Sequence, residues 1–398
     1  MENDPDDIHG FSRSLELAIK RLDDPIVSQH NKELIQRFIH ASKKKGDKRS
    51  TQARDCNHMR WILKRYKRDL DMMTEFDFDN LIDSLERDKK NDYNYRKLVK
   101  KFFRWYTNDD VPKWVHDIKM PKMVTPIQPS DLLTKKELEK LFAACEHPRD
   151  KAMIAVALDS SMRVGALGTL RIKSVVHNTY GAVLYISTTS RNTKSTKPQP
   201  VPLTWSTGYL NKWIDVHPSK DDPEAPLWVN VRGNAKGMAM QYKNIRICLG
   251  EIAERAGIKR KVNYHLFRHQ KITEMILQGY TDQQIKFQAG WAQNSQQMLE
   301  IYGNFKDEDM VNSIYEKTGL KMKAEDIQLK ATQCPRCNAV LMPGARVCHQ
   351  CALVLDAALN KEGEEAKDKA QELILKAMGT PEFMEKIKSI MEESAKKN

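Results

Sequence analysis

Four prolines fall within residues 107–130, in a stretch where apolar residues have no regular spacing. Proline locks one backbone dihedral and lacks an amide hydrogen, so it is excluded from the interior of helices and central strands. The stretch is therefore predicted to be a linker between two separately folded parts. The chain has 398 residues, 40% of them hydrophobic, which is enough to give each part its own core.

Residues 12–106, before the linker, are predicted to form an all-helical domain. Apolar residues recur at helical spacing over residues 12–45, and the segment 22–28 interrupts them as a turn. A further helix is predicted from Ser50 or Thr51. Its sequence places basic residues between apolar ones, namely Arg60, Lys64, Arg65, Lys67 and Arg68.

Residues 131–320, after the linker, are predicted to form a second domain that is mostly helical with a small antiparallel sheet. Thr134 and Glu137 have the spacing of a capping box, which marks the start of its first helix. Two short strands are predicted over 181–187 and 199–203, joined by a polar loop, and helical patterns return from about 240 to 317. The fold class is therefore mainly α.

Four of the seven cysteines lie within eighteen residues near the C-terminus, as two CxxC pairs separated by ten residues. Two such pairs can complete a tetrahedral zinc shell, and with no ligand position left open the zinc would be structural. The predicted ligands are Cys334, Cys337, Cys348 and Cys351, in a module over 332–356 that precedes a helical tail over 360–398. So few cysteines in so long a chain argue against a disulfide scaffold and for a reducing compartment.

The formal net charge of +13 is placed unevenly along the chain. Residues 1–125 hold 27 basic and 22 acidic groups, residues 126–325 hold 28 and 20, and residues 326–398 hold 11 and 11. This excess favours a polyanionic partner, although a lysine-rich solvated surface would give the same count. No apolar run is long enough for a membrane span and the N-terminus is acidic, so we expect a cytoplasmic, nucleoid-associated protein with no membrane partner.

Several residues of the second domain could together perform chemistry on a phosphodiester. Arg163 and Arg268 could clamp its non-bridging oxygens, and His265 shares a helix face with Arg268 because they are three residues apart. Tyr302 could attack the phosphorus, and Lys194 or His265 could protonate the leaving oxygen. Each residue alone also has an ordinary structural explanation, as a surface cation, a capped core histidine, a solvated loop lysine or a packed aromatic.

In this order and with these flanks, the residues resemble the tyrosine recombinases, also called phage-integrase-type site-specific recombinases. The segment DSSMRVGALGTLR resembles the first catalytic box and contains Arg163, and TKSTKPQPVPL resembles the hairpin of the catalytic lysine, here Lys194. HLFRH resembles the HxxRH box, with His269 as its second histidine. GWAQNSQQMLEIY resembles the last box, with Trp291 and Tyr302.

The resemblance implies an enzyme that cuts and rejoins double-stranded DNA at attachment sites through a 3′-phosphotyrosyl intermediate, as four protomers on two duplexes. Arg163 and Arg268 would bind the phosphate, His265 and Trp291 would hydrogen-bond or buttress it, Lys194 would protonate the leaving oxygen and Tyr302 would attack. No ATP, catalytic metal or small-molecule substrate is expected. Residues 12–106 would be the core-binding domain that clamps the other face of the DNA.

The pattern departs from the family in two places. The acidic residue common three positions after the first arginine is replaced by Ala166, and the spacing from Trp291 to Tyr302 is slightly long. The cysteine module is an addition that most resembles archaeal or archaeal-virus integrases, which favours integration and excision of a mobile element or viral genome. The alternatives are a chromosome-dimer resolvase, a type IB topoisomerase-like relaxase and a catalytically inactive DNA-binding or directionality protein.

Overall fold

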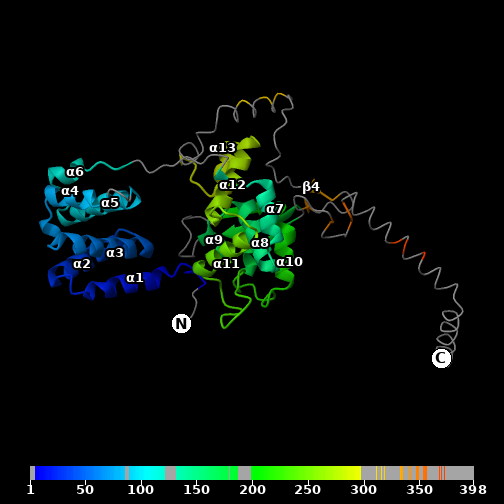
Figure 1. The fold of residues 1–398 in the computed structure, drawn as a ribbon, viewed down its shortest axis with the longest axis horizontal. Coiled ribbons are helices and arrows are strands. Elements are labelled where there is room, and N and C mark those ends of the chain that lie inside the picture. The colour runs from blue at the N-terminus through cyan, green and yellow to red at the C-terminus, as the bar shows by residue number, and fades with distance from the viewer. Residues whose placement is uncertain are drawn as a thin grey trace.

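The computed structural model describes residues 5–85, 89–121, 131–178, 180–186 and 199–296, together with short pieces between 311 and 372. In Figure 1 the helices up to α6 form one body and the elements from α7 to α13 form another. Within the described ranges no helix is both long enough and apolar enough to cross a bilayer.

The first body is helical throughout, as the sequence predicts. Its aromatic centre is Phe38, which packs edge-on against Phe102 and Trp105 with ring centroids 5.8 and 5.4 Å apart. The predicted break at 22–28 holds a short 3-10 turn and the N-cap of the next helix, Ser28, whose hydroxyl accepts the amide of Asn31 at 3.1 Å. The elements are α1 (Phe11–Lys20), η1 (Arg21–Asp23), α2 (Gln29–Lys44), α3 (Arg49–Tyr66), η2 (Leu70–Met72), α4 (Glu75–Asp83), α5 (Lys89–Tyr106) and α6 (Lys113–Asp117).

Helix α6 lies inside the segment that the sequence predicts to be a linker. Val115 of α6 is fully buried and Ile118 nearly so, and both belong to the core of the first body. Trp114 packs against the rings of Phe78 and Phe103. Apolar residues at positions 114, 115 and 118 are enough for one helical turn to bury a face, so part of the predicted linker extends the helical domain.

The N-terminal residues 6–9 belong to the second body, although α1 belongs to the first (Figure 1). Ile8 is 1% exposed and packs into the second core, where its carbonyl accepts the Tyr242 amide at 2.8 Å. Asp6 forms an ion pair with Arg171 at 3.3 Å. The carboxylate of Asp7 accepts the first amides of α1 at 2.9 Å, so the same short segment also caps the first helix of the other body.

The second body is built around α8, of whose thirteen residues ten are buried. Helix α8 contacts α10, α12 and β3, so its C-terminal end lies where three other elements meet. The capping box predicted at Thr134 and Glu137 is confirmed at the start of α7. The helices are α7 (Lys135–Ala143), α8 (Pro148–Ser160), α9 (Val164–Gly168), α10 (Thr207–Asp215), α11 (Tyr242–Arg255), α12 (Tyr264–Leu277) and α13 (Asp282–Ala289).

The sheet of the second body has three antiparallel strands in the order β1 (Val175–Asn178), β2 (Gly181–Ile186) and β3 (Gln199–Leu203). Ala182, Leu184 and Ile186 face the core, in the alternation expected of a half-buried strand. The two predicted strands are confirmed, but β1 was not predicted because its side chains are mostly exposed and give no apolar alternation. Beyond α13, the described pieces include the strand pair β4 (Thr332–Gln333) and β5 (Val340–Leu341).

Candidate active site

Arg163 lies at the turn between α8 and α9, where its backbone provides the N-cap position of α9. Ser161, two residues earlier, has a φ of 54°, a left-handed conformation that ends α8 and redirects the chain. Trp228, fully buried, donates its indole N–H to the Leu167 carbonyl at 2.9 Å and so fixes the other end of α9. The turn that carries Arg163 is therefore held at both sides.

Helix α12 contributes His265 and Arg268, as their spacing predicts. The side chain of Asn263 caps this helix by accepting the Leu266 amide at 2.9 Å. Arg268 is only 3% exposed, and its Nη1 donates to the Ser161 carbonyl at 2.7 Å. This bond joins α12 directly to the turn that carries Arg163, so the two predicted phosphate-binding arginines come from elements that are hydrogen-bonded to each other.

Trp291 follows α13, which ends at Gly290 in the left-handed conformation with a φ of 63°. The Trp291 ring packs on the small core of α12 and α13, with the guanidinium carbon of Arg268 5.3 Å from its centroid. Lys286 of α13 donates to the Gln293 carbonyl at 2.7 Å and holds the chain that leaves Trp291. Trp291 therefore lies against Arg268, and its role towards the phosphate stays a prediction.

The charges of the two arginines act together on the exposed His265. Partial desolvation of the ring, together with the positive charges of Arg268 and Arg163, lowers the pKa of His265. Burial, His265 and Arg268 lower the pKa of His269 to about 4, and its ring centroid is 4.2 Å from that of His265. Both imidazoles are accordingly neutral at pH 7, and an anionic ligand would offset the positive potential that surrounds them.

Four predicted site residues lie outside the described residues, namely the zinc ligands Cys337 and Cys351 and the catalytic residues Lys194 and Tyr302. Lys194 is five residues before β3 in sequence, and Tyr302 is eleven residues after Trp291. Their roles as proton donor and nucleophile stay predictions. The site that the structure brings together is the set Arg163, His265, Arg268 and Trp291.

Three residues next to this site were not singled out from the sequence. Asp159, Ser161 and Lys271 lie within four residues of Arg163 or Arg268, and all three are largely or fully buried. One sequence signal was available, since Asp159 is the only acidic residue between 151 and 214 and directly follows the apolar run 152–158. A charge at such a position requires a buried partner.

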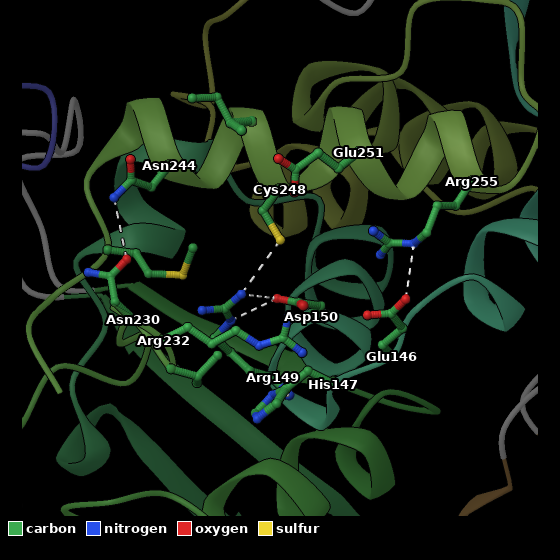
Figure 2. A pocket seen from close by; sticks show the side chains of 13 residues that line it. Glu146, His147, Arg149, Asp150, Asn230, Arg232, Asn244, Cys248, Glu251 and Arg255 are labelled. Atoms are coloured by element: carbon green, nitrogen blue, oxygen red, sulfur yellow. Dashed lines mark hydrogen bonds and ion pairs between the residues drawn. The ribbon is translucent and has the colours of Figure 1, made fainter. Parts of the chain in front are cut away.

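A separate pocket of about 240 Å³ lies between α8, α11 and the segment 230–232 (Figure 2). Its most buried cation, Arg149, donates to the Asp150 carboxylate at 2.7 Å and to the Val229 carbonyl at 3.1 Å. Arg255 at its rim pairs with Glu146 at 3.7 Å. None of the predicted site residues lines this pocket, and its acidic and basic groups balance one another. We therefore do not consider it the candidate active site.

The described part of the site thus brings together two arginines, a histidine and a tryptophan, a set that can bind an anionic ligand. Residues 131–308 match the model of the phage integrase family. The match contains the predicted site residues from Arg163 to Tyr302.

A curated protein is similar in sequence to part of this chain. Transposase A from transposon Tn554 of Staphylococcus aureus is 22% identical over 186 residues, which are 45% of this chain. The chain spans about half the length, 50%, of this curated relative.

Two solved structures share the fold. A lambda integrase tetramer bound to a Holliday junction superposes with a TM-score of 0.53 at 13% identity, covering 70% of this chain and 81% of that one. The Tn1549 transposon integrase in complex with circular intermediate DNA gives 0.54 at 13% identity, covering 71% and 98%. At these identities the likeness concerns the fold alone.

Proposed function

We propose that this protein is a site-specific DNA recombinase that integrates and excises a mobile element. The observation that carries the proposal is the convergence of Arg163, His265, Arg268 and Trp291 inside the segment that matches the phage integrase family. Two guanidiniums can neutralise the non-bridging oxygens of a scissile phosphate and the additional charge of its transition state. Each of these four side chains has a role in the proposed function.

In the proposed reaction the Tyr302 oxygen forms a bond to phosphorus while the bond from phosphorus to the 5′ oxygen breaks. The tyrosine proton is lost to a base, and Lys194 protonates the departing 5′ oxygen. The 5′-hydroxyl of a partner duplex reverses both steps and releases the tyrosine. The phosphoester energy is conserved throughout, so the cycle requires no ATP.

Double-stranded DNA is the proposed partner, bound by four protomers across two duplexes. The lambda integrase neighbour was solved as a tetramer on a Holliday junction, and the Tn1549 neighbour with circular intermediate DNA. The basic excess in residues 1–325 supports a polyanionic partner. A chromosome-dimer resolvase would use the same site, and the additional C-terminal module favours a mobile-element integrase, of the archaeal or viral kind, over it.

We also propose that Cys334, Cys337, Cys348 and Cys351 hold one structural zinc ion. Cys334 and Cys348, one from each CxxC pair, are buried in one cluster with Leu341, which supports the proposal. Cys334 follows β4, which pairs with β5, and Cys348 follows Val347, which pairs with Val354; the Cys348 amide also donates to the Leu353 carbonyl at 2.8 Å. One zinc per chain by elemental analysis supports this proposal, and a metal-free folded module contradicts it.

The nucleophile can be tested by covalent trapping. Tyr302→Phe removes one hydroxyl and no charge, so it should abolish covalent protein–DNA product while DNA affinity stays within about twofold of wild type. The substrate is a nicked duplex carrying the attachment sequence, identified by sequencing the DNA on both sides of the gene. The matched control is Tyr280→Phe, at an exposed tyrosine just before α13. Covalent product from the Tyr302→Phe protein would exclude Tyr302, and none from wild type would favour an inactive DNA-binding protein.

A further inference from the structure

Asp159 holds together the chain segments that carry the candidate site. Its carboxylate, 1% exposed, accepts the Thr204 amide at 2.6 Å and hydroxyl at 2.7 Å. It also accepts the Ser206 hydroxyl at 2.8 Å and amide at 3.2 Å. Thr204 and Ser206 follow directly after β3, so one side chain fixes the end of that strand to the end of α8.

The same carboxylate reaches α12. Lys271 of α12 places its ammonium 3.7 Å from Asp159 and 3.9 Å from Glu274. Burial alone would lower the pKa of Lys271, but the charges of Asp159 and Glu274 outweigh it and raise that pKa, so the ammonium stays charged. Lys271 is one helical turn from Arg268, and Asp159 is four residues before Arg163.

Helix α13 is tied to the same place through the backbone. The side-chain amide of Gln288 donates to the Asp159 carbonyl at 3.2 Å and to the Pro202 carbonyl at 3.3 Å. The Ser161 hydroxyl donates to the Gln288 carbonyl at 3.2 Å. The end of α8 is thus connected to α12, α13 and β3. His265 and Arg268 belong to α12, Trp291 and Tyr302 follow α13 in the sequence, and Lys194 precedes β3.

We propose that Asp159 is a positioning residue for strand cleavage, with Lys271 as its charged partner. Its hydrogen bonds set the Arg163 turn relative to α12 and to the end of the β2–β3 hairpin, in whose loop Lys194 lies by sequence. The proposal rests on the function proposed above. Since Ala166 supplies no carboxylate, Asp159 is the acidic group that this segment of the chain offers to the site.

The decisive comparison is between two variants at this position. Asp159→Ala removes every side-chain acceptor, so cleavage at saturating protein should fall about 10- to 100-fold, because small displacements of catalytic groups have effects of this size. DNA affinity should stay within about twofold. Asp159→Asn keeps an acceptor oxygen for the amides and a donor for the Thr204 hydroxyl, so it should recover a large part of the rate.

The matched control is Asp221→Asn, which neutralises an exposed carboxylate in the turn after α10 and should cleave at a near-normal rate. If Asp159→Ala does not fold, the pair Thr204→Val with Ser206→Ala removes the donor hydroxyls instead and should show a milder loss of the same kind. Normal cleavage by Asp159→Ala or by this pair, or a loss no larger than the loss of DNA affinity, overturns the proposal.

Hydrogen exchange separates this proposal from the proposed function. The Thr204 and Ser206 amides should exchange faster in Asp159→Ala than in wild type, and at the wild-type rate in Asp221→Asn. Hydrogen exchange requires no catalysis. A wild-type protein that does not cleave DNA would contradict the proposed function, but the exchange rates would still test the anchor, which is the set of hydrogen bonds from Thr204 and Ser206 to Asp159. Unchanged exchange at both amides would overturn the anchor even in an active enzyme.

Discussion

Arg268 combines two contacts that depend on the shape of a guanidinium. It donates to the Ser161 carbonyl at 2.7 Å while its planar group lies 5.3 Å from the Trp291 ring centroid. Arg268→Lys should therefore lower the cleavage rate about 100-fold or more, because an ammonium cannot hold the carbonyl and also present a two-donor fork to a phosphate. Single-turnover covalent trapping measures this rate, and Arg246→Lys at an exposed position of α11 is the control. A normal rate for Arg268→Lys would contradict its assignment to the phosphate.

His269 makes the stability of the second body depend on pH. Burial, His265 and Arg268 lower its pKa to about 4, from 6.5 for an unperturbed histidine. As pH falls below the unfolded value, the unfolded chain takes up a proton that the folded chain does not, so stability is full above about pH 6.5 and declines towards pH 4. The decline should be on the order of 2 kcal/mol, after allowing for solvent at the ring edge.

Chemical denaturation at pH 7 and pH 5 tests this expectation. His269→Gln should lose less stability over this range than wild type, since glutamine does not titrate. The exposed His40 supplies the control, and His40→Gln should behave like wild type. The interpretation is wrong if His269→Gln and wild type lose stability equally on acidification.

At the level of elements, the features that were predicted correctly from the sequence are those that depend on residues close together in the chain. The capping box at Thr134 and the joint placement of His265 and Arg268 on one helix follow from spacings of three residues, and both are confirmed. Strand β1, helix α6 and the Asp159 contacts were missed. Strand β1 pairs with the neighbouring β2 but exposes most of its side chains, whereas α6 and the Asp159 contacts depend on partners distant in sequence, such as Phe78 for Trp114 or Thr204 for Asp159. Spacing within a short window carries no information on such pairs.

The N-terminal segment 6–9 is the clearest case of a segment that is held in place by residues distant in the sequence. Gly168 at the end of α9 has no side chain, and a Cβ there would lie 2.4 Å from Ile8 Cδ1. Ile8→Ala should weaken this contact by about 2–4 kcal/mol, the usual cost of truncating a buried isoleucine. The Tyr242 amide, which donates to the Ile8 carbonyl, should then exchange with solvent faster.

Ile19→Ala is the control for this experiment, because Ile19 lies on α1 and is 37% exposed. It should leave exchange at Tyr242 unchanged. Equal exchange at Tyr242 in wild type and Ile8→Ala would show that the segment does not hold its place through Ile8.

At the scale of the whole molecule, the excess of positive charge lies in the part of the chain that contains the two bodies. The excess of basic over acidic residues lies entirely in residues 1–325, while residues 326–398 hold eleven of each. Part of the basic helix α3 is already engaged within the protein, since Arg60 pairs with Asp24 and Arg65 stacks 3.4 Å above Trp61. Lys64 and Lys67 of the same helix region are exposed and open to phosphates.

This distribution predicts that a protein ending at residue 325 keeps most of its DNA affinity. Affinity for duplex DNA depends on salt with a log–log slope of about −0.9 per phosphate contacted, and a segment of balanced charge contributes little to that slope. The truncated and full-length slopes should therefore agree within about one unit. Filter binding or fluorescence anisotropy over a range of salt concentrations measures both, after thermal unfolding has shown that the truncated protein is folded.

Lys64→Gln together with Lys67→Gln provides the positive control, because removing two exposed charges should reduce the slope by up to about two units. The mutant leaves residues 326–398 intact, so it separates loss of phosphate contacts from loss of the C-terminal segment. A truncated protein that loses nearly all affinity at low salt would assign DNA binding to the C-terminal segment. In that case residues 326–398 would contact DNA through interactions that do not depend on net charge. Removing them should then leave the salt dependence of the remaining DNA affinity unchanged.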